Sequence, residues 1–165
     1  MSMATPPSVL IVQNDPDLRA LMVETMHDVD ADVASASTGR LASVMIAARH
    51  YDLALIDASL PDMSGIALAG LAAQKAIPAV LISGHAATVA QLRQHDFPYL
   101  QRPFCAEQLR EASRRAIHEG TMNILKVKAA SAVIETRLAV LRSDVAESHL
   151  MVAELRAKPD RRNIA

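Results

Sequence analysis

The fold class can be read from one segment, Leu53-Ala54-Leu55-Ile56-Asp57-Ala58-Ser59-Leu60-Pro61-Asp62-Met63-Ser64-Gly65. The apolar residues 53–56 predict a buried strand, and residues 61–65 predict a loop that leads into a helix. Asp57 then stands at the carboxyl end of the strand, and in an open parallel sheet that end faces the functional crevice. Its carboxylate is a candidate nucleophile or metal ligand, and the alternative is a carboxylate that only starts a turn.

The same alternation of strand and helix extends in both directions from this segment. Further strands are predicted at residues 9–12, 32–36, 78–83 and 99–100. The first helix is predicted to begin with Asp15 as N-cap and Pro16 as its first residue. Later helices are predicted at residues 38–48, 66–73, 87–94 and 106–118. Five strand-then-helix units predict an α/β fold, a five-stranded parallel sheet with helices on both faces.

Residues 121–158 contain neither Gly nor Pro and carry a different pattern. A seam of ten positions, eight of them apolar, recurs at spacings of three and four: Ile124, Val127, Ser131, Ile134, Leu138, Leu141, Val145, Ser148, Val152 and Leu155. This heptad spacing predicts a long C-terminal α-helix, which cannot bury such a stripe alone. The predicted organisation is a domain over residues 8–119, a coiled-coil-like dimerisation extension over 121–158 and a disordered tail over 159–165.

The extension is expected to make a homodimer through residues 124–155. The charged positions beside the seam do not determine how the helices would pair. In a parallel homodimer Arg137 would face Arg142 of the partner, which is unfavourable, and only Asp144 facing His149 would help. Several apolar residues also lie off the seam: Leu125, Val133, Val140 and Leu150. The helix therefore either pairs, buries more than one face in a bundle, or folds back on its own domain.

Composition narrows the class of protein. About half of the 165 residues are hydrophobic (51%) and Trp is absent, so the core must be aliphatic. A formal net charge of −1 argues against a chain-wide nucleic-acid footprint. The single cysteine, Cys105, excludes an internal disulfide framework and fits a reducing compartment. There is no signal peptide and no apolar run long enough to span a membrane, so a cytoplasmic protein without membrane contact is expected.

Five segments, each located at a strand end, together resemble the receiver domain of two-component response regulators: residues 9–19, 51–57, 60–65, 78–86 and 99–104. The resemblance covers about residues 8–119 and implies a flavodoxin-like topology. It also implies that Asp57 is the phospho-acceptor, that Ser83 binds the phosphoryl group and that Tyr99 is the aromatic switch. The implied partner is a sensor histidine kinase or a phosphotransfer protein, and the implied protein is a signalling module rather than an enzyme. The Arg102-Pro103 bond, at the family's Lys-Pro turn, is predicted to be cis.

The chain departs from the family pattern at the metal site. The family holds Mg²⁺ with the strand-three Asp, an acidic pair after strand one and a backbone carbonyl, here that of Ser59. In this chain Gln13 and Asn14 replace the acidic pair, and Arg102 replaces the Lys. Asn14 still offers a neutral oxygen, and Asp15 is expected to point toward the helix start. Because the two carboxylates of the acidic pair are gone and Asp57 alone remains, Mg²⁺ binding is expected to be weak or absent. A guanidinium can pair bidentately with Asp57 and take the metal's place, unless Asn and Arg are tolerated variants of a working site.

Three functions compete. The leading hypothesis is a single-domain response regulator of a phosphorelay, degenerate at its phospho-acceptor site, that acts by protein–protein contact. The second is a pseudo-receiver scaffold that never takes phosphate. The third is an RNA-binding antiterminator, which would need a compact three-helix module where residues 121–158 show no breaker.

Overall fold

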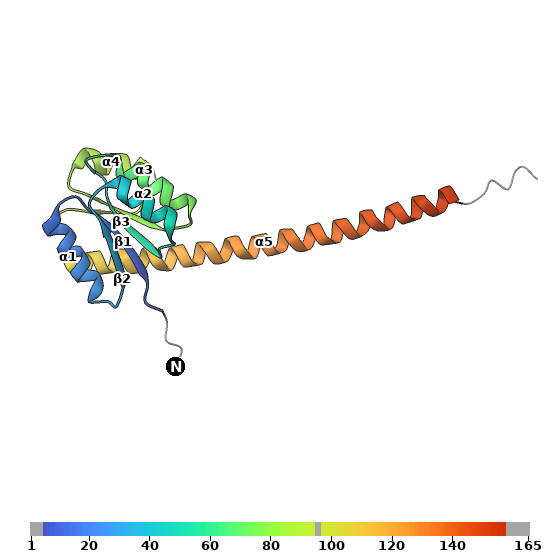
Figure 1. Cartoon of the computed structure of the whole chain (residues 1–165), viewed down its shortest axis with the longest axis horizontal. Coiled ribbons are helices and arrows are strands. Elements are labelled where there is room, and N and C mark those ends of the chain that lie inside the picture. Colours follow the sequence, from blue (N-terminus) through green and yellow to red (C-terminus); the bar gives the residue numbers. More distant parts are fainter. Residues whose placement is uncertain (1–4, 95–96, 158–165) are drawn as a thin grey trace, which may run out of the picture. The chain divides into compact units, whose positions relative to one another are not determined.

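The computed structural model describes residues 5–94 and 97–157 (Figure 1). Its elements alternate in chain order: β1 (Ser8–Val12), α1 (Pro16–His27), β2 (Asp32–Ala36), α2 (Gly39–Ala48), β3 (Leu53–Asp57), α3 (Gly65–Gln74), β4 (Ala79–Ser83), α4 (Ala86–Gln94), β5 (Tyr99–Gln101) and α5 (Ala106–Ala157). The predicted strands and the starts of the helices are confirmed to within one residue.

The strands form one parallel sheet in the order β2-β1-β3-β4-β5. The order reverses direction after β1, so β1 and β3 lie side by side and their carboxyl ends share one edge. Val12 pairs with Ile56, and Asp57 pairs with Ile82 of β4. The topological switch point, where open α/β sheets carry their sites, therefore lies next to Asp57.

Two separate cores cover the two faces of the sheet (Figure 1). Alternate strand residues point to opposite faces. One face packs against α2, α3 and α4 through residues such as Ile46 and Leu68. The other packs against α1 and the first turns of α5, through residues such as Met26 and Leu109. The central strand β3 is buried along its whole length, as its apolar run predicts.

Two helix starts are fixed by carboxylates. The Asp15 side chain accepts hydrogen bonds from the backbone N–H groups of Asp17 and Leu18 and caps α1, as predicted. Asp62, from the loop after β3, accepts hydrogen bonds from the backbone N–H groups of Gly39 and Arg40 at 2.9 and 2.8 Å. Asp62 thereby ties the loop that follows Asp57 to the start of α2.

Helix α5 does not end at residue 118, where the sequence analysis placed its end, but continues through Gly120 to Ala157. A Cβ on Gly120 would lie 2.7 Å from the Pro78 Cγ, so this glycine allows the helix to approach the segment before β4. The glycine is therefore explained by its packing against Pro78 and does not mark the end of a helix. By its contacts the chain divides into two compact units, Met1–Met122 and Asn123–Ala165.

The second unit is described for residues 123–157, and it is helical throughout. Residue 158 and the tail over 159–165, predicted to be disordered, lie outside the described residues. The seam side chains that are described are exposed, from 47% for Leu138 to 65% for Val127. No helix among the described residues is long and apolar enough to cross a membrane.

Candidate functional site

The ends of three neighbouring strands bring the predicted site residues together. Asp57 ends β3, Ser83 ends β4, and Arg102 directly follows β5. The Arg102 backbone N–H donates to the Ser83 carbonyl at 2.8 Å, which extends the β4–β5 ladder to the edge of the sheet. Gln13 follows β1, and its backbone N–H donates to the Ala36 carbonyl at 3.0 Å.

Asp57 is buried, at 4% exposure, and its two carboxylate oxygens have different partners. Oδ1 accepts a hydrogen bond from the backbone N–H of Ser59 at 2.8 Å. Oδ2 lies 3.8 Å from the Arg102 Nη2, which is an ion pair at a distance too long for a hydrogen bond. The predicted pairing is thus present as one long contact, and it is not bidentate.

The Arg102 guanidinium lies beside Gly84, the residue that directly follows β4. A Cβ on Gly84 would lie 3.2 Å from the Arg102 Nε and 3.3 Å from Nη2. Nε is buried without a hydrogen-bond partner. The Arg102-Pro103 peptide bond is cis, as predicted. An open hollow lined by Leu18, Gly84, His85, Arg102, Pro103 and Phe104 gives solvent access to this guanidinium.

The positions of the family's acidic pair have a different role in this chain. Gln13 is buried at 1% exposure, and its Oε1 accepts from the Asp15 backbone N–H at 3.0 Å. Its Nε2 is buried with no partner. Since Oε1 is engaged in the loop, the remaining polar atom of Gln13 is a hydrogen-bond donor. Asn14 is exposed, and Asp15 is engaged as the cap of α1, away from the site.

Arg19 is a site neighbour that the sequence analysis missed. Its Nη1 donates to the backbone carbonyls of Gln13 at 2.6 Å and of Asn14 at 3.2 Å. The side chain reaches back from the first turn of α1 and fixes the loop after β1. Its place six residues after Gln13, on the helix that this loop enters, is the only signal in the sequence.

Ser83 and Tyr99 lie on neighbouring strands but are separately engaged. The buried Ser83 hydroxyl lies 3.3 Å from both the His85 carbonyl and the His85 backbone nitrogen. Tyr99 is partly buried against the core on the α4 side of the sheet. Its hydroxyl accepts a hydrogen bond from the Arg93 Nε at 3.1 Å, and this contact raises the pKa of Arg93. The ring is therefore held by the exposed end of α4.

Gly65 shapes the loop that carries Ser59. A Cβ at this position would lie 2.1 Å from the Asp57 carbonyl oxygen and 2.7 Å from the Ala58 Cα. The Gly65 backbone N–H donates to the Ala58 carbonyl at 3.2 Å, and Ser59 pairs with Ser64 in an isolated bridge. Only glycine fits where the start of α3 meets the end of β3, and the loop between them folds tightly beside Asp57.

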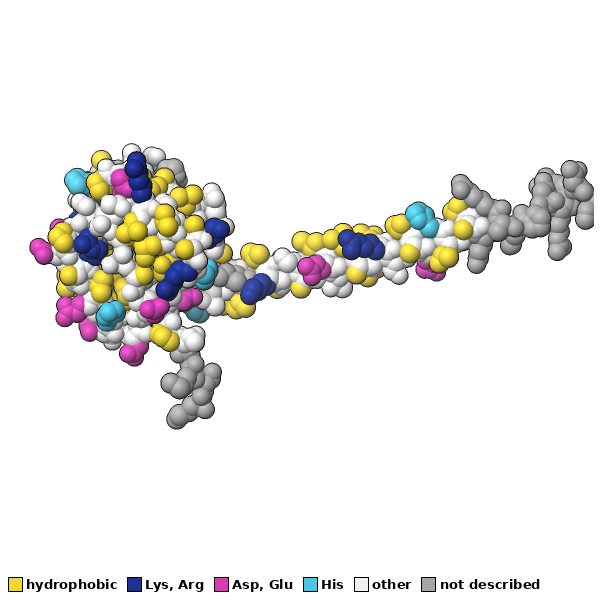
Figure 2. Space-filling view, viewed as in Figure 1, with side chains coloured by type: hydrophobic (Ala, Val, Ile, Leu, Met, Phe, Trp, Pro, Cys, Tyr) yellow, Lys and Arg dark blue, Asp and Glu magenta, His cyan; other side chains and the backbone are white. Residues whose placement is uncertain are grey.

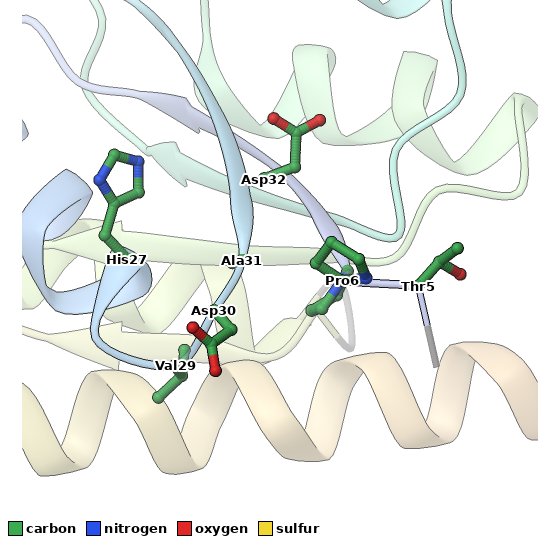
Figure 3. Close-up of a pocket in the computed structure, with 8 residues that line it drawn as sticks. Thr5, Pro6, His27, Val29, Asp30, Ala31 and Asp32 are labelled. Carbon is green, nitrogen blue, oxygen red and sulfur yellow. The ribbon is translucent and has the colours of Figure 1, made fainter. Parts of the chain in front are cut away.

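A second hollow lies at the start of the strands (Figure 3). Its lining includes Thr5, Pro6, His27, Asp30 and Asp32, and Asp32 is paired with Arg49 at 2.9 Å. Figure 3 shows the His27 ring and the two carboxylates apart from one another. Within residues 5–94 and 97–157, no group of three His, Cys, Asp or Glu side chains is placed to hold a metal ion.

Comparison with known proteins identifies the family. Residues 9–114 match the model of the response regulator receiver domain, and the chain belongs to this family. Receiver domains are signalling modules that interact with sensor histidine kinases or phosphotransfer proteins, and they are generally not enzymes. Nothing in the described part of the chain points to catalysis.

Two curated relatives are transcriptional or nitrogen regulators. The chain is 29% identical over 119 residues to the C4-dicarboxylate transport transcriptional regulatory protein DctD of Rhizobium meliloti, covering 69% of the chain and 26% of the relative. It is 27% identical over 161 residues to the nitrogen assimilation regulatory protein NtrX of Azorhizobium caulinodans, covering 93% and 34%. The chain thus spans about a quarter to a third of the length of these relatives.

A solved structure with the same fold is the receiver domain of the sensor histidine kinase PA1611 from Pseudomonas aeruginosa. That receiver has a magnesium ion coordinated in its active-site cleft. The superposition gives a TM-score of 0.62 at 19% identity and covers 68% of this chain and 98% of the other. It shows that the fold is shared.

Proposed function

We propose that this protein is a response regulator of a phosphorelay whose phospho-acceptor site, around Asp57, is degenerate. In this proposal Asp57 receives the phosphoryl group, Ser83 contacts it, and Tyr99 changes position in response. The observation that carries the proposal is the pairing of the buried Asp57 carboxylate with Arg102, in a site whose acidic pair is replaced by Gln13 and Asn14.

The residues present do not fit the divalent ion that receiver domains bind. Mg²⁺ requires oxygen ligands, with carboxylates to offset its dehydration. Of the four positions that would supply these ligands, only Asp57 carries a carboxylate. Two of the others offer the Ser59 carbonyl and the neutral Asn14 amide. Gln13 has its oxygen engaged in the loop and leaves an N–H donor. We infer that Mg²⁺ binds weakly or not at all.

Arg102 takes over part of the cation's electrostatic role. An acyl phosphate on Asp57 would bring more anionic oxygens to the site, and charge neutralisation is the main help a protein gives to such a group. The Arg102 Nε is a buried donor without a partner, and the Asp57–Arg102 contact is long at 3.8 Å. A guanidinium in this state has donor capacity left for a second anionic group.

The output is proposed to be protein–protein contact, including homodimerisation through residues 124–155. The described seam side chains are exposed and apolar, and exposed stripes of this kind mark association surfaces. Since α5 runs without a break to Ala157, residues 121–157 do not form the three-helix module that an RNA-binding antiterminator would need.

Incubation with acetyl phosphate, followed by intact-mass measurement, tests the phospho-acceptor role. The wild-type chain is expected to gain one phosphoryl group slowly and with little dependence on Mg²⁺, and Asp57→Asn is expected to gain none. The variant Gln13→Asp/Asn14→Asp is expected to react faster and to require Mg²⁺. If even this variant takes no phosphate, the chain is a pseudo-receiver scaffold. Fast, Mg²⁺-dependent labelling of the wild type would refute the degeneracy of the site.

A further inference from the structure

The helical extension, residues 123–157, carries a symmetry that fixes how two copies can meet. Figure 2 shows hydrophobic side chains along the extension with only a few charged groups between them. The six described apolar residues of the seam, Val127, Ile134, Leu138, Leu141, Val145 and Val152, are all exposed. This inference rests on the proposed function, in which a second copy of the chain binds this stripe. The direction and register of the pair are not part of that proposal.

We propose that two copies of the extension pair antiparallel, with the twofold axis passing between Ala139 and Val140. In this alignment every seam residue faces a seam residue of the partner. Leu138 meets the partner's Leu141, Ile134 meets the partner's Val145, and Val127 meets the partner's Val152. The seam therefore closes along its full length from residue 124 to residue 155.

The same alignment brings the two polar positions of the seam together. Ser131 faces the partner's Ser148, and by symmetry the contact occurs twice. A register shifted by one heptad would place each serine against an apolar residue, so the two polar positions of the seam would no longer meet. The spacing of the two serines about residues 139 and 140 thus favours one antiparallel register.

The charges beside the seam favour the same alignment. Reversing one helix brings each flank of the seam against the same flank of the partner, so Glu135 lies beside the partner's Arg142. Taken from the sequence alone, Arg137 and Asp144 form a second such combination on the other flank. Each combination occurs twice in a symmetric dimer. Lys128 comes beside the partner's His149 in this alignment, a pair that contributes no attraction.

Other alignments put like charges together. A parallel pair sets Arg137 against the partner's Arg142. Shifting the antiparallel register by one heptad sets Glu135 against Glu135, or Arg142 against Arg142, of the two copies. Like charges directly opposed across helices are destabilising. Neither Glu135 nor Arg142 has an opposite charge three or four residues away in its own helix. Their charges are therefore available to a second chain.

Reversal of one charge distinguishes the two directions by the sign of its effect. In the antiparallel pair, Arg142→Glu places two carboxylates side by side and is expected to weaken dimerisation about fivefold or more. In a parallel pair the same change would relieve the Arg137–Arg142 repulsion and tighten the dimer. The double variant Glu135→Arg/Arg142→Glu is expected to restore wild-type affinity. The readout is the dimer dissociation constant of the full chain from sedimentation or light scattering at low salt.

Spin-label distances test the register directly. The exposed Cys105 is first replaced by Ser, and single cysteines are placed at the exposed, outward positions Ala129 and Ser143. In the proposed pair, identical residues are offset along the helix axis by about 31 Å at 129 and about 10 Å at 143, at 1.5 Å per residue. A parallel pair has no offset at either site. The expected result is a clearly longer label-to-label distance at 129 than at 143.

The outcomes separate this inference from the proposed function. A dimer with equal distances at both sites, or one tightened by Arg142→Glu, overturns the antiparallel pairing and leaves self-association standing. A monomer at micromolar protein overturns both self-association and the pairing. An assembly larger than two chains overturns the two-helix register. None of these results bears on whether Asp57 accepts phosphate.

Discussion

Large apolar side chains are mostly buried in the first of the two units of this chain and exposed in the described part of the second. In the receiver unit, β3 is buried along its length and two aliphatic cores close the faces of the sheet without help from another chain. In the helical extension, the apolar seam residues whose side chains are described are exposed. The same residue types thus form a core in the first unit and lie exposed on a helix in the second. The difference follows from the sequence pattern. Strands that alternate with helices allow the helices to cover both faces of the sheet, whereas a single helix has no second element to cover its apolar stripe.

The largest effect is expected at the centre of the seam. Leu138→Lys/Leu141→Lys should abolish dimerisation, because each leucine contributes about 1.5–3 kcal/mol when fully buried and a buried lysine carries a large desolvation cost. The melting of the receiver unit should not change. Light scattering and calorimetry on the full chain measure both. Thr136→Lys/Ser143→Lys, with the same added charge on the outward side, is the matched control and should remain dimeric. A dimer that survives the leucine changes would have to form through the receiver unit instead.

A smaller effect, confined to the receiver unit, is expected from Gly65→Ala. The added Cβ would meet the Asp57 carbonyl oxygen at 2.1 Å, so backbone must move, at a cost of about 1–3 kcal/mol or more. Gly70→Ala in the same helix has no atom within 4 Å of the added Cβ and should instead stabilise by up to about 1 kcal/mol. Urea unfolding of both variants measures the difference. Equal stabilities would mean that the loop beside Asp57 is not tightly packed.

The smallest effect is expected at Asp62, whose carboxylate holds the start of α2. The backbone N–H groups of Arg40 and Gly39 lower the pKa of Asp62 below its ordinary value. A lowered pKa in the folded state means that the contribution is present above the unfolded pKa, about 3.9, and is lost as the pH falls through the folded value. Asp62→Asn should therefore melt slightly lower than wild type at pH 7, and the two should converge at strongly acidic pH. A difference that is constant across pH would contradict this origin.

Much of the receiver unit could be predicted because its strands are short apolar runs that end at polar residues. The strand bounds, the α1 cap at Asp15 and the strand-end positions of Asp57, Ser83 and Arg102 all follow from that pattern. The continuation of α5 through Gly120 was not predicted, because a glycine is a helix-breaking signal and the contact with Pro78 that explains it is distant in sequence.

The hydrogen bonds and distances within the site were less predictable, because they too depend on contacts between different segments. Arg19 and Asp62 form hydrogen bonds with backbone groups of other segments. The identity of a side chain does not predict which backbone group it will bind. The Asp57–Arg102 pair was foreseen, but its single long contact depends on how the guanidinium rests against Gly84. Local patterns predicted which residues meet, and tertiary packing determined their geometry.

The charge around Asp57 is expected to control metal binding at this receiver site. Calorimetric titration of Mg²⁺ into the wild-type chain and into Gln13→Asp/Asn14→Asp tests it most directly. Asp57→Asn in the variant background serves as the control for binding elsewhere. Because the double variant regains two carboxylates, its Mg²⁺ affinity should exceed that of the wild type by about tenfold or more. Equal affinity in the two proteins, or tight binding by the wild type, would mean that the charge of residues 13 and 14 does not control metal binding.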